Sequence, residues 1–600
     1  MSLGTTNHRV TSKVWLRIFQ HLNGGSPYQE TNPQMITESR VKKRKVIWPH
    51  ILLVLLLLTL AGVYFYDRVP NWRAAPVPSL DRPKVVIGGL QVDSFALVSG
   101  ETTLLPFETV QKHMDPALHW DAKSESLVVT TQDKVLTMQT ESLTAYVNRR
   151  PVSLNVPATT KDTVYVPMDV LEPLYKIKGR VVESTGTIFY DFLTKPVQTA
   201  AVIARKSNLR AGPSIHEPIV TALVEGDMLE VIRVGEWYAA TTKTGHFGFV
   251  REKEVALREV VTPKVEATQP REPWRPKGKI NLTWEQVISK NPDVATVKDM
   301  PGLNIVSPTW FSVADEEGNV KNKADSRYVR WAHSKGFKVW ALVDNGFDPA
   351  RTSIVLSDLR KREKIIQQLL AYAALYSIDG INIDFENINF ADRGLLVQFV
   401  RELAPLCREQ GLTVSMDVTI KSKSPTWSMC YDRKALAEAV DYLMLMAYDE
   451  HTAGSGVAGS VGSLPWVEEG IKGVLEEVPA ERLVLGVPFY TRLWREETKN
   501  GIFTVTSKAL GMEAAEEALR LNQAVIQWDS ESGQNFGVYR EGSAQCKIWL
   551  EDQESMALRV ALVRKYGLAG IASWRRGFEK PAIWNVLLNG LEQEGRRREQ

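Results

Sequence analysis

One segment, Asp379–Glu386 (Asp-Gly-Ile-Asn-Ile-Asp-Phe-Glu), constrains the fold more than any other part of the chain. Side chains alternate along a β-strand, so Asn382, Asp384 and Glu386 share one face and the apolar residues that alternate with them share the other. Polar side chains that point inward, with apolar ones outward, reverse the pattern of an ordinary half-buried strand. A closed parallel barrel wrapped in helices explains the reversal, because its outer face meets helices and its polar residues gather at the mouth.

The N-terminus carries a long apolar run behind a basic cluster. Residues 46–66 are almost continuously apolar and follow the Lys- and Arg-rich stretch 40–45. A run of this length matches about 30 Å of hydrocarbon, and positive charge stays on the cytoplasmic side. We therefore predict a cytoplasmic tail over 1–45, a single-pass transmembrane helix over 46–66 and an extracellular remainder. A cleaved signal peptide is the alternative, although the long polar leader argues against it.

Length, charge and cysteine usage narrow the class of protein. A chain of 600 residues predicts about three or four domains. Its net charge of +3 gives no argument for a nucleic-acid partner. The three cysteines have no metal or redox spacing, and the histidines are scattered, so we expect no metal and no cofactor.

Two small modules precede the barrel. Residues 85–195 show short strands with a faint internal repeat, seen at 103–107 and again at 164–168. This stretch resembles the copper amine oxidase N-terminal-like domain, an α+β module whose role we interpret as spacing or wall binding, with no copper implied. Residues 199–258 place glycines between apolar strand runs and resemble a bacterial SH3-like domain, a small β-barrel that often holds cell-wall peptide. Linkers are predicted over 67–84 and 259–278.

From residue 279 the pattern changes to strands that alternate with helices, as in βα units. Together with helices at 359–376 and 555–566, it predicts a (β/α)8 TIM barrel over 279–592, with an α+β insertion at about 491–548 between strands seven and eight. The functional residues of such barrels lie at the C-terminal ends of the strands. The predicted strands are Lys279–Leu282, Gly302–Ser307, Lys338–Val343, Gly380–Glu386, Leu412–Val418, Tyr442–Tyr448, Leu483–Pro488 and Gly570–Trp574.

The residues at these strand ends resemble glycoside hydrolase family 18. Asp379–Glu386 matches the family motif Asp-Gly-x-x-x-Asp-x-Glu, residues 446–449 (Met-Ala-Tyr-Asp) match its strand-six motif, and Trp574 matches its strand-eight aromatic residue. Two longer phrases, at 382–387 and 547–571, resemble the branch of the family that includes spore-cortex peptidoglycan hydrolases.

The resemblance implies a retaining glycosidase that uses substrate assistance, in which the 2-acetamido oxygen of the sugar attacks the anomeric carbon. Glu386 would protonate the leaving oxygen and then activate water, while Asp384 would orient the acetamido group. Tyr448, aided by Asp449, would hold the acetamido carbonyl, and Trp574 would form the floor of the sugar site. The other candidates for substrate binding are Asn382, Met446 and Asp417.

Asn382 departs from the family pattern, which often has Asp at this position. The amide removes a negative charge beside Asp384, so we expect Asp384 to ionise more easily and to accept a hydrogen bond from Asn382. We also expect ionised Asp384 to raise the pKa of Glu386, which suits a general acid near neutral pH.

These features predict a membrane-anchored extracellular glycosidase that cleaves N-acetylglucosaminyl bonds. The SH3-like module and the anchor favour peptidoglycan as the polymer. A chitinase or chito-oligosaccharide hydrolase is the alternative within the same class. Outside that class, a non-catalytic protein that binds cell-wall carbohydrate through a degenerate barrel would carry the same modules, and the carboxylate pair alone would also fit a structural ion site.

Overall fold

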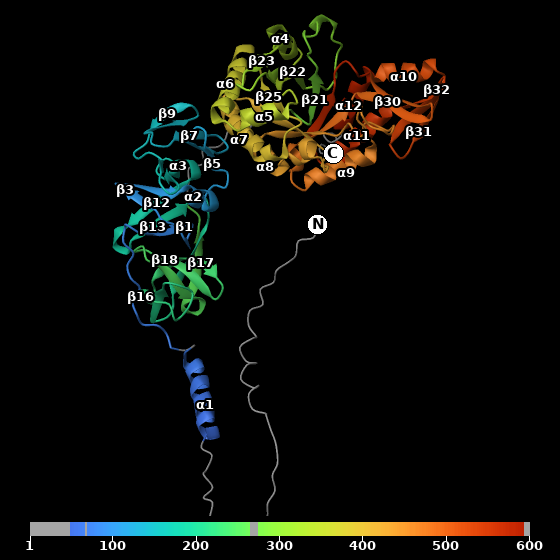
Figure 1. The fold of residues 1–600 in the computed structure, drawn as a ribbon. Coiled ribbons are helices and arrows are strands. Elements are labelled where there is room, and N and C mark those ends of the chain that lie inside the picture. Colours follow the sequence, from blue (N-terminus) through green and yellow to red (C-terminus); the bar gives the residue numbers. More distant parts are fainter. Residues whose placement is uncertain (1–47, 67–68, 264–273, 593–600) are drawn as a thin grey trace, which may run out of the picture. The chain divides into compact units, whose positions relative to one another are not determined.

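The computed structural model of the chain describes residues 48–66, 69–263 and 274–592 (Figure 1). The chain divides into two compact units, with the boundary in the sequence between Pro70 and Asn71. The tail predicted over 1–45 and the centre of the linker predicted over 259–278 lie outside the described residues. In the first unit, the apolar run forms helix α1 (Trp48–Tyr66). None of the helices in the described ranges combines the length and the apolarity that crossing a membrane requires.

The first module of the second unit is built from two strand–helix repeats that pair with each other. Strand β4 (Thr102–Pro106) runs into helix α2 (Phe107–His113), and β11 (Val164–Pro167) is followed by α3 (Glu172–Tyr175). The two strands are antiparallel neighbours with Leu105 opposite Val166, so both repeats share one core. The other strands are β1 (Lys84–Ile87), β2 (Leu90–Val92), β3 (Leu97–Ser99), β5 (His119–Asp121), β6 (Ser126–Thr130), β7 (Val135–Gln139), β8 (Thr144–Val147), β9 (Arg150–Ser153), β10 (Thr159–Thr160), β12 (Ile177–Val182) and β13 (Thr187–Phe192).

The next module is one seven-stranded antiparallel sheet in the order β16-β15-β19-β18-β17-β14-β20. Tyr238 is buried in its core, whereas Trp237 is partly exposed beneath the guanidinium of Arg251, 5.6 Å from the ring centroid. The SH3-like name for this sheet stays a prediction. Its strands are β14 (Val197–Val202), β15 (Lys206–Arg210), β16 (Ile219–Val224), β17 (Met228–Val234), β18 (Trp237–Thr242), β19 (Phe247–Arg251) and β20 (Val255–Val261).

The predicted TIM barrel is confirmed. Eight parallel strands follow one another around the barrel, and β21 closes it by pairing with both β22 and β34. A short antiparallel strand, β23 (Val320–Asn322), adds to the edge of β22. The barrel strands are β21 (Ile280–Glu285), β22 (Ile305–Val313), β24 (Lys338–Asp344), β25 (Gly380–Asp384), β26 (Thr413–Thr419), β27 (Tyr442–Met446), β28 (Leu483–Pro488) and β34 (Gly570–Trp574).

Helices cover the outside of the barrel, and their ends follow from local sequence. Asp358 caps the first turn of α6 by accepting from the amide of Arg360, and Asp552 and Ser555 form a capping box at the start of α11. The long helices predicted at 359–376 and 555–566 are therefore present with nearly the predicted ends. The barrel helices are α4 (Ser326–Ser334), α5 (Pro349–Leu356), α6 (Leu359–Tyr376), α7 (Arg393–Glu409), α8 (Arg433–Ala439), α9 (Leu464–Leu475), α11 (Gln553–Lys565) and α12 (Ala582–Glu592).

Strand β25 has the inverted pattern that its sequence predicts. Ile381, Ile383 and Phe385 lie in the core between strands and helices, where the ring of Phe385 stacks on Phe399 of α7 at 5.4 Å. Gly380 begins the strand where a Cβ would come within 2.7 Å of a carbonyl oxygen of β26, so the neighbouring strand leaves no room for a side chain.

An α+β insertion follows β28 and precedes β34, as predicted. Its five-stranded sheet, in the order β30-β29-β33-β32-β31, packs against one helix. The first strand starts two residues after β28 ends, so its leading residues stay at the barrel mouth. The elements are β29 (Tyr490–Lys499), β30 (Ile502–Gly511), α10 (Met512–Leu521), β31 (Val525–Asp529), β32 (Gln534–Glu541) and β33 (Ala544–Trp549).

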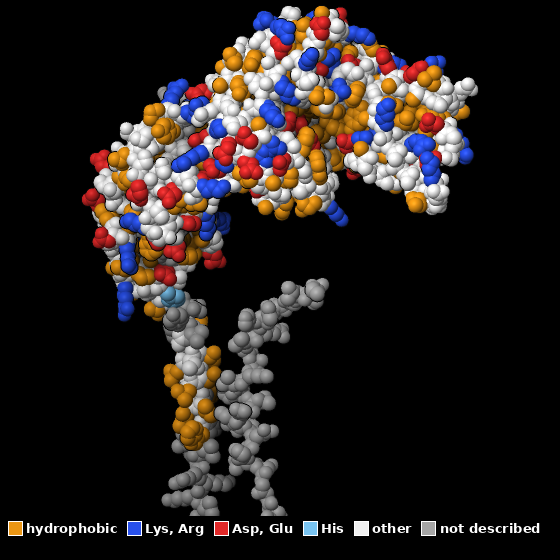
Figure 2. Space-filling view, turned by 45° about the horizontal axis from the view of Figure 1, so that its top comes forward, with side chains coloured by type: hydrophobic (Ala, Val, Ile, Leu, Met, Phe, Trp, Pro, Cys, Tyr) orange, Lys and Arg blue, Asp and Glu red, His pale blue; other side chains and the backbone are white. Residues whose placement is uncertain are grey.

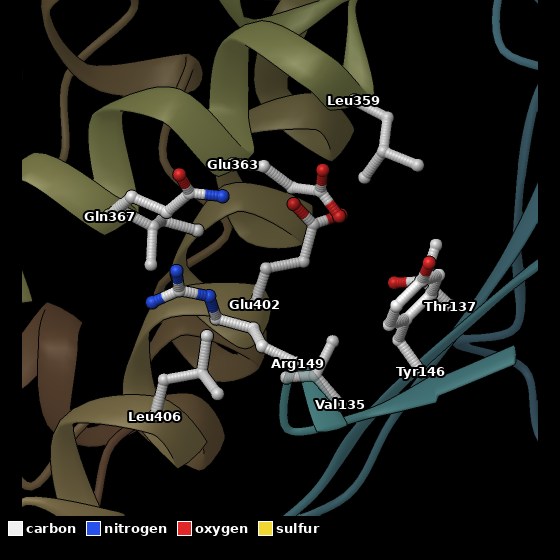
Figure 3. Close-up of a pocket in the computed structure, with 10 residues that line it drawn as sticks. Val135, Thr137, Tyr146, Arg149, Leu359, Glu363, Gln367, Glu402 and Leu406 are labelled. Atoms are coloured by element: carbon white, nitrogen blue, oxygen red, sulfur yellow. The ribbon is translucent and has the colours of Figure 1, made fainter. Parts of the chain in front are cut away.

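A buried ion cluster joins the first module to the barrel helices. Arg362 of α6 is fully buried and donates two 2.9 Å hydrogen bonds to Glu402 of α7. Asp121 of β5 accepts from the amide of Leu359 at 2.9 Å and lies 3.5 Å from Arg362. Beside the cluster is a cavity of about 280 Å³ between the two domains, into which Tyr146 projects from the module (Figure 3).

Candidate active site

Glu386 lies two residues beyond the end of β25, and its backbone is held from the neighbouring strand. Asn345, directly after β24, donates to the carbonyl of Glu386 at 2.7 Å and accepts from its amide at 3.1 Å. The hydroxyl of Tyr431 donates to the carbonyl of Phe385 at 2.9 Å. Since Asn345 and Tyr431 are both buried, these three hydrogen bonds fix the base of the Glu386 side chain at the barrel mouth.

Asp384 is a buried carboxyl group among other carboxyl groups. It lies opposite Asp344 in the parallel register of β24 and β25, and its Oδ1 has no hydrogen-bond partner within the described ranges. Burial raises the pKa of Asp384 well above its usual range, and Glu386, Asp417 and Asp344 raise it further. Asp384 therefore does not ionise easily in this site, because like charges remain around it after one has been replaced by an amide. The expected easing of its ionisation by Asn382, relative to an aspartate at that position, stays a prediction.

Glu386 has the pKa of a group that can exchange a proton at neutral pH. Burial raises the pKa of its carboxyl group to about 7, with smaller contributions from Asp449 and Asp344. The predicted direction is correct, but burial is the main cause, and the ionised neighbour expected to raise it, Asp384, is not among the principal contributors. A carboxyl group with this pKa is suited to general acid–base chemistry near pH 7.

Asn382 forms no hydrogen bond with Asp384 and instead bonds to three other strands in the barrel interior. Its Nδ2 donates to Asp417 at 2.7 Å and to Ser415 at 3.2 Å. Its Oδ1 accepts from the indole of Trp284 at 2.8 Å and from the hydroxyl of Ser307 at 3.2 Å. The predicted hydrogen bond to Asp384 is thus absent, since the amide uses all its hydrogen-bonding positions on β21, β22 and β26.

Tyr448 and Asp449 follow β27 at the same end of the barrel. The ring of Tyr448 lies 6.3 Å from that of Tyr490, the first residue of the insertion. Burial raises the pKa of Tyr448, as do the nearby charges of Asp417 and Asp384, which places its side chain among the carboxyl groups. Asp449 accepts a 2.5 Å hydrogen bond from the hydroxyl of Tyr490 and lies 3.4 Å from Arg492.

The remaining predicted residues divide into two groups. Trp574 ends β34, is partly exposed and tilts against Trp284 at 6.1 Å, so one aromatic face is held at the mouth. Met446 and Asp417 are buried, with exposed fractions of 8% and 1%. Asp417 accepts a hydrogen bond from Asn382, and its charge raises the pKa of Asp384. Its role in substrate binding stays a prediction.

Sequence reasoning missed three residues that shape this site, Asp344, Tyr490 and Arg492, and counted a fourth, Asn345, only as a weak candidate. Asp344 ends β24, Asn345 follows it, and Tyr490 and Arg492 open the insertion. Each lies at or just beyond the C-terminal end of a barrel strand, which is the signal that could have found them. Together with the predicted residues they gather carboxyl, tyrosine and tryptophan side chains from the ends of six strands at one end of the barrel.

Comparisons with known proteins agree with this geometry. Residues 288–579 match the model of glycosyl hydrolases family 18, and residues 86–189 match that of the copper amine oxidase N-terminal domain. The uncharacterized glycosylase YvbX of Bacillus subtilis (strain 168) is 24% identical over 48% of this chain and 85% of its own length. The cortical fragment-lytic enzyme of Bacillus anthracis is 25% identical, over 47% and 67%. The di-N-acetylchitobiase of Mus musculus is 27% identical, over 42% and 74%.

The family match spans the barrel from just after β21 to just after β34 and contains the carboxyl cluster at its mouth. The chain is therefore a glycosyl hydrolase whose catalytic domain belongs to family 18, preceded by a copper amine oxidase N-terminal domain.

Proposed function

We propose that this glycosyl hydrolase cleaves N-acetylglucosaminyl bonds of peptidoglycan, with retention of configuration and with assistance from the substrate. One observation carries the proposal: Glu386 combines a pKa of about 7 with a fixed position at the barrel mouth, two residues from a buried carboxyl group. The similarity to a cortical fragment-lytic enzyme supports peptidoglycan, and the similarity to a di-N-acetylchitobiase supports an N-acetylglucosamine unit in the substrate.

The proposed reaction has two steps. In the first, the carboxyl proton of Glu386 moves to the glycosidic oxygen as the bond from that oxygen to the anomeric carbon breaks. The acetamido oxygen of the same sugar bonds to the anomeric carbon and forms an oxazolinium ion. In the second step water attacks the anomeric carbon and gives a proton to the Glu386 carboxylate. The bond from the acetamido oxygen to the anomeric carbon breaks, which opens the oxazolinium ring. Two inversions at one carbon leave its configuration retained.

Asp384 would act through its charge during the first step. Its carboxylate is unfavourable in the empty site because it is buried among other carboxyl groups. Positive charge that develops on the acetamido group offsets the cost of this carboxylate. The attraction between Asp384 and the acetamido group is therefore stronger in the transition state than in the ground state. Tyr448 would hold the acetamido carbonyl, and Trp574 would support the sugar ring.

Digestion of purified peptidoglycan tests the proposal. The full chain in detergent and its Glu386→Gln variant are incubated with peptidoglycan, and the fragments are identified by mass spectrometry after borohydride reduction. We expect reduced N-acetylglucosamine ends from the native chain and none from the variant. Reduced muramic acid ends would reassign the bond, comparable turnover of chito-oligosaccharides would favour a chitinase, and binding without any fragments would favour a carbohydrate-binding protein.

The pH dependence of kcat/KM should have an alkaline limb near pH 7. The acid must carry its proton at the start of the reaction, and the pKa of Glu386 in the free enzyme is about 7. Activity is therefore present below this pH and falls as the pH rises through it. Initial rates on a neutral N-acetylglucosamine oligomer between pH 4 and pH 9 measure the limb. A rate that stays flat to pH 9 would contradict the assignment of Glu386 as acid.

Replacing Asn345 with alanine should lower kcat about 100-fold while KM changes little. The backbone of Glu386 loses the two hydrogen bonds that fix it, so the carboxyl group is no longer held in position. Asn345→Asp keeps the acceptor for the Glu386 amide but adds a negative charge. This variant should therefore also move the alkaline limb of the pH profile to higher pH. Asn389→Ala is the matched control, since the Asn389 side chain donates to Pro349 and Ser353 of α5 and forms no hydrogen bond with Glu386. Equal losses in the control and in Asn345→Ala would refute the positioning role.

The location of the protein is a separate proposal that rests on the sequence. We propose that residues 46–66 anchor the chain in the cytoplasmic membrane, with the tail over 1–45 inside and the catalytic domain outside. Helix α1 itself does not combine the length and the apolarity of a membrane span, so the proposal rests on the run over 46–66 in the sequence. The leucines along α1 are exposed over about half of their surface, for example Leu53 at 54% and Leu57 at 55%, and apolar side chains cover that helix in Figure 2. Release of the chain from membranes by an alkaline wash would contradict the anchor.

A further inference from the structure

Arg575 places a positive charge beside the sugar-facing end of the barrel. It directly follows Trp574, the last residue of β34, so it stands at the same mouth as the carboxyl cluster. Its guanidinium carbon lies 3.8 Å from the centroid of the Phe578 ring, and its Nη1 donates to the carbonyl of Arg576 at 3.3 Å. These contacts hold the guanidinium in place, and most of its five N–H groups have no acceptor within the described part of the chain.

The carboxylates nearest to Arg575 are engaged elsewhere. Glu285 forms an ion pair with Arg576, and Glu579 accepts from the amide of Gly577 at 2.5 Å. Among the described residues, Arg575 forms no ion pair of its own. Burial lowers the pKa of Arg575 and the charge of Arg576 lowers it further, while the charges of Glu285 and Glu579 raise it, so the neighbouring carboxylates offset the effect of burial only in part. A partly buried positive charge without an ion pair of its own is unfavourable, and an anionic ligand would compensate it.

The chemistry of the two possible polymers differs at this point. Chitin is neutral, whereas the muramic acid of peptidoglycan carries a lactyl ether whose carboxyl group is either free or linked to a peptide with its own carboxylates. A fixed guanidinium with free N–H groups matches a carboxylate better than any neutral sugar substituent, because it can donate two parallel hydrogen bonds to it.

We propose that Arg575 binds a carboxylate of the substrate next to the sugar held by Trp574, and that it selects acidic peptidoglycan over neutral chitin. The proposal rests on the proposed function of the same site and names the group that would determine its specificity. Arg576 does not share this role, since its guanidinium is already paired with Glu285.

The test compares one glycan in two charge states. Glycan strands from which the peptides have been removed carry free lactyl carboxylates, and coupling with methylamine converts these carboxylates to neutral amides. Initial rates are measured on both forms and on chitohexaose for the native chain, Arg575→Gln, Arg575→Lys and the control Arg360→Gln. Arg360 is an exposed arginine of α6, so the control removes the same charge elsewhere.

We expect Arg575→Gln to lower kcat/KM on the acidic strands about 10-fold to 100-fold, the value of one charged hydrogen-bonded contact. Rates on the amidated strands and on chitohexaose should change less than about twofold. Arg575→Lys should retain part of the preference for acidic over amidated strands, and Arg360→Gln should retain all of it. KM of the native chain for the acidic strands should rise with salt, and that for chitohexaose should not.

Three other outcomes are distinguishable. Equal losses on acidic and neutral substrates, with a native melting temperature, would overturn the role of Arg575 and leave peptidoglycan hydrolysis intact. If Arg575→Gln does not fold, the native chain still tests the role of Arg575. A KM for the acidic strands that changes neither with salt nor with amidation would overturn that role. A native chain that cleaves chitohexaose but neither form of the strands would instead refute peptidoglycan as the substrate.

Discussion

Glu386→Gln is expected to lower kcat on natural glycan by about 1,000-fold or more, because the amide keeps the volume of the carboxyl group but has no acidic proton to give. The loss should depend on the leaving group. A 4-methylumbelliferyl glycoside leaves readily without protonation, so the variant should still release the first equivalent of fluorophore faster than it cleaves glycan. Rapid-mixing fluorescence on the full chain measures this release.

A uniform loss on both substrates would show that Glu386 supports the fold or the binding of sugar and is not the acid. Thermal melting of the variant separates these cases. Removing a carboxyl group whose burial raises its pKa to about 7 should leave the melting temperature unchanged or slightly higher at pH 8. The sign follows from the linkage between proton binding and unfolding. Above the pKa that the carboxyl group has in the unfolded chain, the unfolded chain is stabilised by ionisation, which burial opposes in the fold. The group therefore lowers the free energy of unfolding at pH 8.

Arg362→Ala should destabilise the second unit by about 3–5 kcal/mol, the cost of leaving buried charges without their partner. Arg362 is 0% exposed and holds Asp121 of the first module together with Glu402 of α7. Although burial opposes it, hydrogen bonds from Ser124 and the charge of Arg362 lower the pKa of Asp121, which marks this carboxylate as ionised in the fold. The midpoint of urea unfolding, followed by tryptophan fluorescence, measures the change.

Two variants make this result specific. Arg360→Ala removes an exposed arginine two residues away on α6 and should change the stability by less than about 0.5 kcal/mol. The triple variant Asp121→Asn, Arg362→Met and Glu402→Gln removes all three charges and should recover most of the loss. An Arg362→Ala chain that unfolds at the same urea concentration as Arg360→Ala would show that the cluster contributes nothing to the junction between the two domains.

The parts of this site that could be predicted are those encoded within one strand. Alternation along β25 was enough to place Asp384 and Glu386 at a barrel mouth, and the strand ends located Tyr448 and Trp574. The hydrogen bonds of Asn345 to Glu386 could not be predicted in the same way, because they join two strands that are 41 residues apart. The contact of Asp121 with Arg362 spans 241 residues and two domains, and no local pattern encodes it.

The protonation of the site shows the same limit. Reasoning from one substitution predicted that Asn382 would ease the ionisation of Asp384, yet the pKa of Asp384 is raised because burial and three other carboxyl groups act on it. A pKa in a barrel mouth depends on every charge that the fold brings within reach, and most of those charges belong to other strands.

The amide of Asn382 frees the barrel interior from a protonation requirement. Both of its N–H groups and both lone pairs of its oxygen are engaged, by Ser415, Asp417, Trp284 and Ser307. An aspartate at this position would remove both donors and set a carboxyl group against Asp417. The interior could then avoid a repulsion between two carboxylates only if one of them kept a proton, whereas the amide donates to Asp417 at any pH.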